Sequence, residues 1–226
     1  MKKVFLSIAL FGSATLLNAE LFTEYFDNHV VKSKIEYKDG TRTDTQEGIK
    51  HGLEEVFYET GELAFTVRNV EGKREGTMDW YSREGKHLEI MRYKNGLRHG
   101  LNVIFYDNGN LRIEVNYIDD NKEGPEKYYF DSGKLASEVN FVHGYKEGIQ
   151  KEYNEDGTLN NEVMYKHGYQ EGEKRWFDAK GNIIQTIRYR MDRPIDIMKK
   201  VQSKKSDPTN DLLQGLDFNP NNRKVD

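Results

Sequence analysis

The chain has 226 residues, and 34 Lys and Arg against 38 Asp and Glu give it a formal net charge of −4. A mildly acidic chain lacks the basic surface that nucleic acids and anionic lipids require, which argues against both as the main partner. The absence of cysteine excludes disulfides, thiolate nucleophiles and zinc–thiolate sites. Because there are 20 glycines and only 4 prolines, we expect many tight turns between regular elements.

The first residues predict an export signal. Lys2 and Lys3 precede an almost wholly apolar run from Val4 to Leu17, and Ala19 ends a cleavage-site pattern. The run is short for a transmembrane helix, and no stop-transfer pattern follows it; an uncleaved anchor is the alternative. We therefore expect a signal peptide at residues 1–19 and export to the periplasm, the cell surface or the medium of a bacterium.

Glycines then recur with a step of 24 residues. One series is Gly52, Gly76, Gly100, Gly124, Gly148 and Gly172, and a second is Gly61, Gly85, Gly109, Gly133, Gly157 and Gly181. A third series, Gly72, Gly96, Gly144 and Gly168, has Asp120 in its missing place. A fixed period over six copies indicates a repeat architecture in which each unit packs on its neighbours. We expect the first two series to be structural turn residues.

Period-2 alternation makes each unit a β-hairpin. We count positions from the first glycine of each unit, which is position 0. Position 5 is always aromatic and position 15 always apolar, while positions 11 and 17 are apolar except at His87 and Asn69. These odd offsets place the four residues on one face of an extended chain. Three-residue loops that end in the second glycine predict a type I turn with a bulge, so that Phe105 faces Leu111 and Leu101 faces Val115.

The predicted fold is all-β, an elongated single sheet of antiparallel hairpins in meander order that curls over its apolar face. A signal peptide at 1–19 and an N-terminal cap at 20–34 precede the repeat domain at 35–191. A C-terminal cap at 192–202 and a disordered tail at 203–226 follow it. The tail is polar and carries Pro208 and Pro220.

A family resemblance follows from the repeated motif. The run Tyr93-Lys-Asn-Gly96-Leu-Arg-His99-Gly100, followed by Phe105-Tyr106-Asp-Asn-Gly109-Asn-Leu111, resembles the MORN-repeat variant of bacterial proteins. The resemblance recurs in all six copies, over roughly 35–191. It implies an elongated sheet of stacked hairpins and a scaffold or partner-binding role, with no shared catalytic residues. Many such proteins are grouped with YwqK-like antitoxins, which for an exported chain implies an immunity or surface-binding role.

The candidate metal and charge sites are weak. His51 and His99 stand where other units carry glutamate, and His143 and His167 lie one unit apart at a turn. Two ligands without a third do not make a metal site, so we expect solvated turn positions, no metal and no cofactor. Lys50, Arg74, Arg98, Lys122 and Lys146 form a periodic row of positive charge. It could attract an anionic polymer, but interspersed glutamates favour simple charge balance.

The sharpest site hypothesis is an aromatic line predicted on the face opposite the apolar stripe. Position 4 is Val56, Trp80, Ile104, Tyr128, Glu152 or Trp176, and position 6 adds Tyr58, Tyr106 and Phe130. Arg68, Arg92 and Arg188 are expected on the same face. Aromatic residues mixed with arginine are typical of binding surfaces, and an aromatic ladder suits sugar rings or an extended peptide. The alternative is that these aromatics only pack against neighbouring hairpins.

We therefore expect an exported, non-enzymatic repeat protein that binds a protein partner along its sheet. The candidate binding residues are Trp80, Ile104, Tyr106, Tyr128, Phe130, Trp176, Arg68, Arg92 and Arg188. The first alternative is a cell-envelope structural or glycan-binding protein. An enzyme with a site across repeats ranks last, because most polar residues recur by period, as scaffold positions do. Neither nucleic acid nor strong membrane binding is expected.

Overall fold

A computed structural model describes residues 19–42 and 47–198. The expected signal peptide, apart from Ala19, and the expected tail at 203–226 lie outside these residues. The described part contains strands only: β1 (Ala19–Tyr25), β2 (Val31–Lys38), β3 (Lys50–Phe57), β4 (Leu63–Val70), β5 (Lys73–Tyr81), β6 (His87–Lys94), β7 (Leu97–Arg98), β8 (Gly100–Phe105), β9 (Leu111–Ile118), β10 (Asn121–Tyr129), β11 (Leu135–Val142), β12 (Tyr145–Tyr153), β13 (Leu159–Lys166), β14 (Tyr169–Phe177), β15 (Ile183–Arg190) and β16 (Arg193–Met198).

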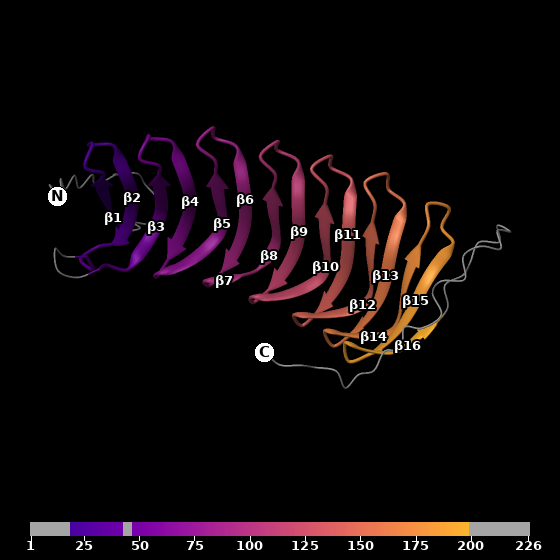
Figure 1. Cartoon of the computed structure of the whole chain (residues 1–226). Helices are drawn as coiled ribbons and strands as arrows, with labels where there is room; N and C mark the ends of the chain where they lie inside the picture. The colour runs from indigo at the N-terminus through magenta and orange to yellow at the C-terminus, as the bar shows by residue number, and fades with distance from the viewer. Residues whose placement is uncertain (1–18, 43–46, 199–226) are drawn as a thin grey trace, which may run out of the picture.

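All strands form one open antiparallel sheet in sequence order, with β7 paired to β6 ahead of β8. Figure 1 shows the strands side by side in one long array, bowed along their length, with turns along two opposite edges. We call the turns at positions 6–10, such as residues 106–110, the upper turns. The turns at positions 19–20, such as residues 119–120, are the lower turns. The predicted all-β sheet of hairpins is confirmed.

The upper turns have the predicted chemistry. In the turn at residues 106–110, the Tyr106 amide donates to the Asn110 carbonyl and the Gly109 amide donates to the Tyr106 carbonyl, at 2.9 and 2.8 Å. Gly109 has a φ of 88°, in the left-handed region that residues with a Cβ seldom adopt. The same pair of bonds closes the other upper turns, including 58–62 and 154–158. Glycine at position 9 is therefore favoured by this backbone conformation.

The strand register differs from the prediction by one residue. Phe105 pairs with Leu111 as predicted, but the next pair is Ile104 with Ile113, because a bulge follows the turn. Val115 consequently pairs with Asn102, whereas the sequence predicted Leu101. A slip of one residue exchanges the two faces of a strand. Position 4 therefore lies on the same face as position 15, and position 5 lies on the opposite face, which corrects the predicted faces.

One face of the sheet holds the core. We call the face that carries Val67, Val115, Val139 and Val163 the inner face, and the other the outer face. The buried apolar side chains are Tyr37, Val67, Met78, Val115, Tyr117, Val139, Phe141 and Val163 on the inner face, and Ala64 on the outer face. No second layer covers them in the described chain. Figure 1 shows that the strands bow. This curvature brings inner side chains of adjacent strands together, so that they cover one another.

A seventh hairpin precedes the six that the glycines mark. β1 and β2 are joined by a turn in which the Phe26 amide donates to the Val30 carbonyl at 2.8 Å. Phe22 pairs with Ile35 as position 2 pairs with position 15 elsewhere. Glu20 therefore occupies position 0, where later units have glycine. The sequence predicted a cap at 20–34 and only half a unit after it, because Glu20 breaks the glycine series and a longer connection follows Lys38.

Candidate binding surfaces

The predicted row of positive charge lies against aromatic rings of the inner face. The Arg98 guanidinium carbon lies 4.2 Å from the Tyr117 ring centre, and the Lys122 ammonium lies 4.8 Å from the Phe141 ring centre. Arg74 with Tyr93 and Lys146 with Tyr165 repeat the contact at 5.3 and 4.8 Å. Each cation comes from one unit and its ring from the next. The row thus joins consecutive units through cation–π contacts, and burial lowers the pKa of the Lys146 ammonium.

In the unit where Asn69 replaces the aromatic ring, the cation of the row, Lys50, contacts a carboxylate. The Lys50 ammonium lies 2.5 Å from Glu54 Oε1, and Asn69 Nδ2 donates to Glu54 Oε2 at 2.9 Å. Glu54 and Asn69 are 7% and 3% exposed, so the carboxylate is buried but paired on both oxygens. The cation that would meet a ring therefore meets a buried acid. The five cations of the row stabilise the repeat array, whatever else they contact.

The predicted aromatic line lies on the inner face with the core. Trp80 packs on Phe65 with ring centres 4.6 Å apart, and the Trp80 indole nitrogen is buried with no hydrogen-bond partner among the described residues. The Lys174 ammonium lies 4.9 Å from the Trp176 ring centre. Ile104 pairs with Ile113 at the same level of the sheet. Only Tyr128 of this line remains substantially exposed.

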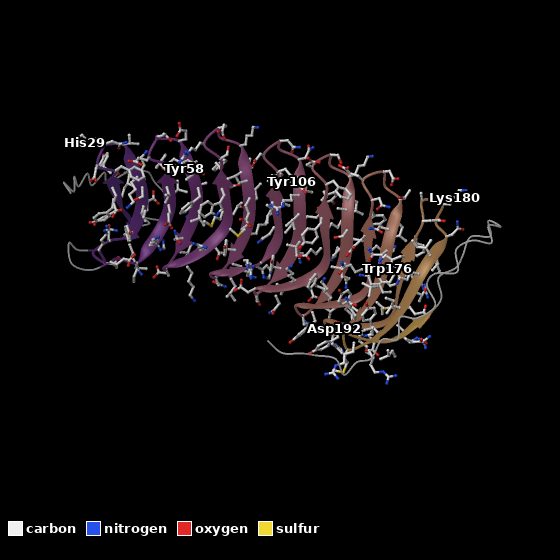
Figure 2. The ribbon with its side chains drawn as sticks, viewed as in Figure 1. His29, Tyr58, Tyr106, Trp176, Lys180 and Asp192 are labelled. Carbon is white, nitrogen blue, oxygen red and sulfur yellow. The ribbon has the colours of Figure 1, made fainter. Side chains whose placement is uncertain are left out.

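The aromatic residues at position 6 connect neighbouring units. The Tyr58 and Tyr106 hydroxyls donate to the carbonyls of Tyr81 and Tyr129, each at 2.7 Å. Figure 2 shows both tyrosines beside the upper turns, with Trp176 farther down the sheet. Phe130 has no hydroxyl to form such a bond, and it is half-buried. The position-6 tyrosines therefore tie one hairpin to the next.

The structure does not bring the predicted binding residues onto one surface. Arg68, Arg92 and Arg188 pair with position-1 and neighbouring residues of the outer face, as in Leu53 with Arg68. Trp80, Ile104, Tyr128 and Trp176 lie on the inner face. The arginines and the aromatic line are therefore on opposite sides of the sheet.

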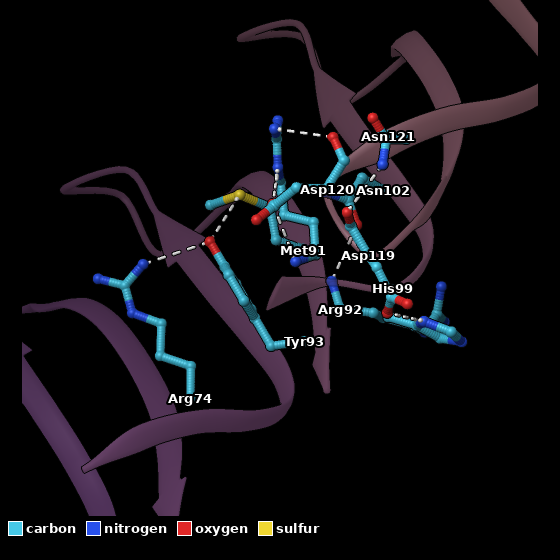
Figure 3. Close-up of polar contacts among 10 residues, drawn as sticks. Arg74, Met91, Arg92, Tyr93, His99, Asn102, Asp119, Asp120 and Asn121 are labelled. Carbon is cyan, nitrogen blue, oxygen red and sulfur yellow. Dashed lines mark hydrogen bonds and ion pairs between the residues drawn. The ribbon is translucent and has the colours of Figure 1, made fainter. Parts of the chain in front are cut away.

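The lower turns are tied to the preceding unit. Figure 3 shows the turn Asp119–Asp120 against His99. The Asp120 amide donates to the Arg98 carbonyl at 3.0 Å, and Arg98 Nε donates to Asp120 Oδ1 at 2.9 Å. Asp120 has a φ of 67°, as the glycine of the other units would allow. Asp120 stands where the other units have glycine. Its contact with Arg98 therefore offsets the cost of its left-handed backbone conformation.

His143 and His167 lie within lower turns, whereas His51 and His99 lie beside the lower turns of the following units. His99 Nδ1 lies 3.1 Å from Asp119 Oδ1, and His51 Nδ1 accepts a bond from the Glu71 amide at 3.3 Å. In other units Glu75, Glu123 or Glu147 accepts the equivalent amide hydrogen. Within residues 19–42 and 47–198, no three His, Asp or Glu side chains are grouped to hold a metal ion.

The outer face carries an exposed apolar row that the sequence did not single out. Its members lie mostly at positions 1, 18 and 21, toward the lower turns, and we call them the outer apolar stripe. They are Ile49, Leu53, Val70, Leu97, Leu101, Ile118, Val142, Tyr145, Ile149, Met164 and Tyr169, each 37 to 60% exposed. Position 1 is leucine or isoleucine in three units. The predicted register, in which Leu101 faces Val115, puts this position on the same face as the core. The one-residue slip turns it to solvent.

Charged side chains border the stripe at its C-terminal end. Arg175 lies 2.7 Å from Glu173 and 3.2 Å from Glu162, and Arg188 lies 3.3 Å from Glu173. Hydrogen bonds from both arginines hold the pKa of the Glu173 carboxyl below its usual range. A hollow of 310 Å³ opens here, lined by Ile149, Val163, Met164 and Gly172 together with Glu162, Glu173 and Arg175. Apolar side chains beside an ordered charge cluster are typical of protein interfaces.

Comparison with known families identifies the repeat. The family model for the MORN repeat variant matches residues 50–68, 98–119, 122–143 and 146–167. Each of the last three segments spans one hairpin. It begins near the start of the hairpin's first strand and ends at the first residue of the lower turn that follows the second strand. No curated protein matches the chain. The described residues hold no helix that is long and apolar enough to cross a membrane.

Proposed function

We propose that this chain is an exported, non-enzymatic repeat scaffold that binds a protein partner along the outer face of its sheet. The observation that carries the proposal is the outer apolar stripe, whose members from Ile49 to Tyr169 reach across most of the repeat array. Contiguous exposed apolar surface marks interaction sites, because water contact with such surface is unfavourable. MORN-type repeats in four segments are consistent with a scaffold.

The chemistry around the stripe favours a protein partner. Tyr145 and Tyr169 expose aromatic rings at the lower edge, and Arg68 lies across from Leu53 on the paired strand. Tyrosine and arginine are the residues that most often anchor protein interfaces. Because the stripe crosses successive hairpins, an elongated partner would meet apolar side chains from several units. The repetition of polar residues by period supports a scaffold rather than an enzyme.

Export and an immunity-type role belong to the same proposal. Lys2, Lys3 and the apolar run that follows support export, and cleavage after Ala19 would leave Glu20–Tyr25 of β1 in the sheet. The antitoxin grouping implied by the repeat resemblance would then mean that an envelope or secreted toxin is bound and blocked.

An affinity capture with matched baits tests the proposal. The full chain, expressed with its own leader and recovered after export, is exposed to envelope and supernatant fractions of its host. A Leu101→Asp/Ile149→Asp bait places charges at two of the stripe's members and so interrupts the stripe. An Ile184→Asp bait is the control, because Ile184 is 42% exposed like Ile149 at 47% but lies outside the stripe. Circular dichroism verifies that all three baits are folded.

We expect one polypeptide on the wild-type and Ile184→Asp baits and its loss from the double variant. A captured protein that is toxic when expressed alone would support the immunity role. The same protein on all three baits would remove the stripe from the proposal. Retention on isolated cell wall, with no polypeptide bound, would favour the glycan-binding alternative.

A further inference from the structure

Six charged side chains of alternating sign cross the middle of the outer face. They stand at positions 3 and 14, one on each strand from β9 to β14, and each pairs in register with the next across the sheet. We call them the outer charge row. They are Glu114, Lys127, Glu138, Lys151, Glu162 and Arg175. Ion pairs of 3.0, 3.8 and 3.2 Å join them two by two, and their side chains are 18 to 43% exposed. The row therefore presents an ordered pattern of charge to whatever contacts this face.

The alternation stops at both ends of this six-strand segment. On the N-terminal side the same line across the sheet continues with Val103 and Ile90, and on the C-terminal side with Thr186. An alternating row with an even number of members has an acid at one end and a base at the other. When such a row is reversed, every acid takes the place of a base. The row is therefore complementary in charge to a reversed copy of itself, and a two-fold axis creates that relation.

The same axis brings apolar side chains of the outer apolar stripe together. An axis parallel to the strands, between β11 and β12, reverses the strand order and keeps the lower turns of both copies on the same side. Val142 of β11 pairs in register with Tyr145 of β12, so each of them faces the other residue in the second copy. Ile118 of β9 likewise faces Tyr169 of β14. All four side chains are 37 to 60% exposed, so the contact removes apolar surface from water on both copies.

The six-strand segment is large enough for a stable dimer. Adjacent strands lie about 4.8 Å apart and a strand of eight residues is about 26 Å long, so the segment offers roughly 750 Å² on each copy. Stable interfaces bury about 800 Å² per partner. Two sheets that pack face to face keep their strands within about 30° of one another, which suits an axis along the strands.

We propose that the outer faces of two copies of this chain pack together over β9–β14 to form a symmetric dimer. The acids of one copy then lie against the bases of the other, and the facing pairs are Lys127 with Glu162, Glu138 with Lys151, and Glu114 with Arg175. The inference rests on the proposed role of the outer apolar stripe in binding, and it assigns a second copy to the C-terminal half of the stripe. The N-terminal half, from Ile49 to Leu101, is left for another partner.

Sedimentation equilibrium of the full chain, recovered after export and measured over a range of concentrations, tests the dimer. Lys127→Glu sets acid against acid at two symmetric places, and Glu162→Lys sets base against base. Each variant alone should raise the Kd of the dimer at least roughly a hundredfold, because facing like charges repel. An equimolar mixture of the two variants should dimerise again, because each changed residue then faces an opposite charge. Lys127 on β10 and Glu162 on β13 are about 14 Å apart within one chain, so a contact inside the chain cannot explain this rescue.

Glu55→Lys is the matched control. Glu55 also stands at position 3 of the outer face, but it lies on β3, outside the outer charge row, so its change should leave the Kd of the dimer unaltered. Circular dichroism verifies that every variant is folded.

Three results would overturn the proposal. They are a wild-type chain that stays monomeric up to on the order of 0.1 mM, single variants that dimerise like the wild type, and a mixture that does not dimerise. A monomer that still captures another polypeptide from the host fractions would leave the proposed function standing without the dimer. A dimer that captures no other polypeptide would support this inference and count against a different protein as partner.

Discussion

Asn69 Nδ2 donates a hydrogen bond to Oε2 of Glu54, 2.9 Å away on the inner face of the sheet. Asn69 is the one position-17 residue, among the six glycine-marked units, that is not aromatic. Its amide gives the buried carboxylate a second partner besides Lys50. The replacement of the aromatic ring by Asn69 is thus compensated by the hydrogen bond between Asn69 and Glu54.

Asn69→Ala should therefore lower the free energy of unfolding by about 1–3 kcal/mol, because one oxygen of a buried carboxylate loses its partner. Denaturant unfolding measures the change. The double variant Glu54→Met/Asn69→Ala should be less destabilised, since Met78 occupies the equivalent buried position in the next unit. An Asn69→Ala protein as stable as the wild type would show that the bond contributes nothing.

Met78→Ala tests the location of the core. Met78 is 1% exposed on the inner face, so truncation leaves a cavity and should cost about 2–5 kcal/mol of stability. Met164→Ala makes the same change at a side chain that is 40% exposed on the outer face, and it should cost no more than about 0.5 kcal/mol. Thermal unfolding of both variants gives the comparison. Similar losses would contradict the assignment of the two faces.

Tyr106→Phe tests the bond between neighbouring units at the upper edge. The variant loses the hydroxyl that donates to the Tyr129 carbonyl at 2.7 Å, and we expect a loss of about 0.5–1.5 kcal/mol. Tyr145→Phe is the control, because Tyr145 is 60% exposed and should tolerate the change. Hydrogen exchange should also quicken at the Tyr129 end of β10 in Tyr106→Phe alone. Unchanged hydrogen exchange at the Tyr129 end of β10 would show that the Tyr106 hydroxyl does not stabilise the contact between the two units.

The Tyr129 hydroxyl predicts a loss of stability at high pH. Burial, together with the hydrogen bond that this hydroxyl donates to Glu114 Oε1 at 2.8 Å, raises its pKa from 10.0 to about 12. The fold thus favours the neutral phenol. Its contribution to stability is complete below about pH 10 and is lost as the pH rises from about 10 through 12.

Tyr129→Phe is the variant that isolates this effect. The difference in unfolding free energy between wild type and Tyr129→Phe should shrink between about pH 8 and about pH 11, because above about pH 10 the unfolded wild type gains stability by ionising this hydroxyl while the folded wild type keeps it neutral. A difference that stays constant across this range would mean that Tyr129 titrates alike in the folded and unfolded chain.

The period, the hairpins and the upper turns could be predicted from the sequence, because glycine at fixed spacing and alternation of polar and apolar residues are local signals. The two faces could not. A bulge after each upper turn shifts the pairing by one residue, so Ile104 and not Phe105 joins Val115 on the inner face. Turn residues alone do not show where a bulge falls, and an error of one residue exchanges core and surface.

The binding surface was mispredicted for the same reason. The sequence predicts the aromatic line on the face opposite the apolar stripe and Leu101 opposite Val115, whereas Trp80 packs on Phe65 on the inner face and Leu101 is exposed on the outer face. The seventh hairpin was missed for another reason: Glu20 stands where glycine marks the later units. A signal was available in Phe22 and Ile35, which follow the spacing of positions 2 and 15.

The lower-turn bonds that join each unit to the one before it, such as the Gly96 amide to the Arg74 carbonyl and the Gly144 amide to the Lys122 carbonyl, repeat with the same geometry at every step. The length of such an array therefore grows by a constant step with each unit. Each unit adds two strands, or roughly 10 Å, to the length of the sheet. Removal of residues 100–123 would shorten the sheet by one unit and bring Gly124 to the place of Gly100. The hydrogen bonds between the remaining units would be kept. The length of the sheet is then set by a whole number of repeats.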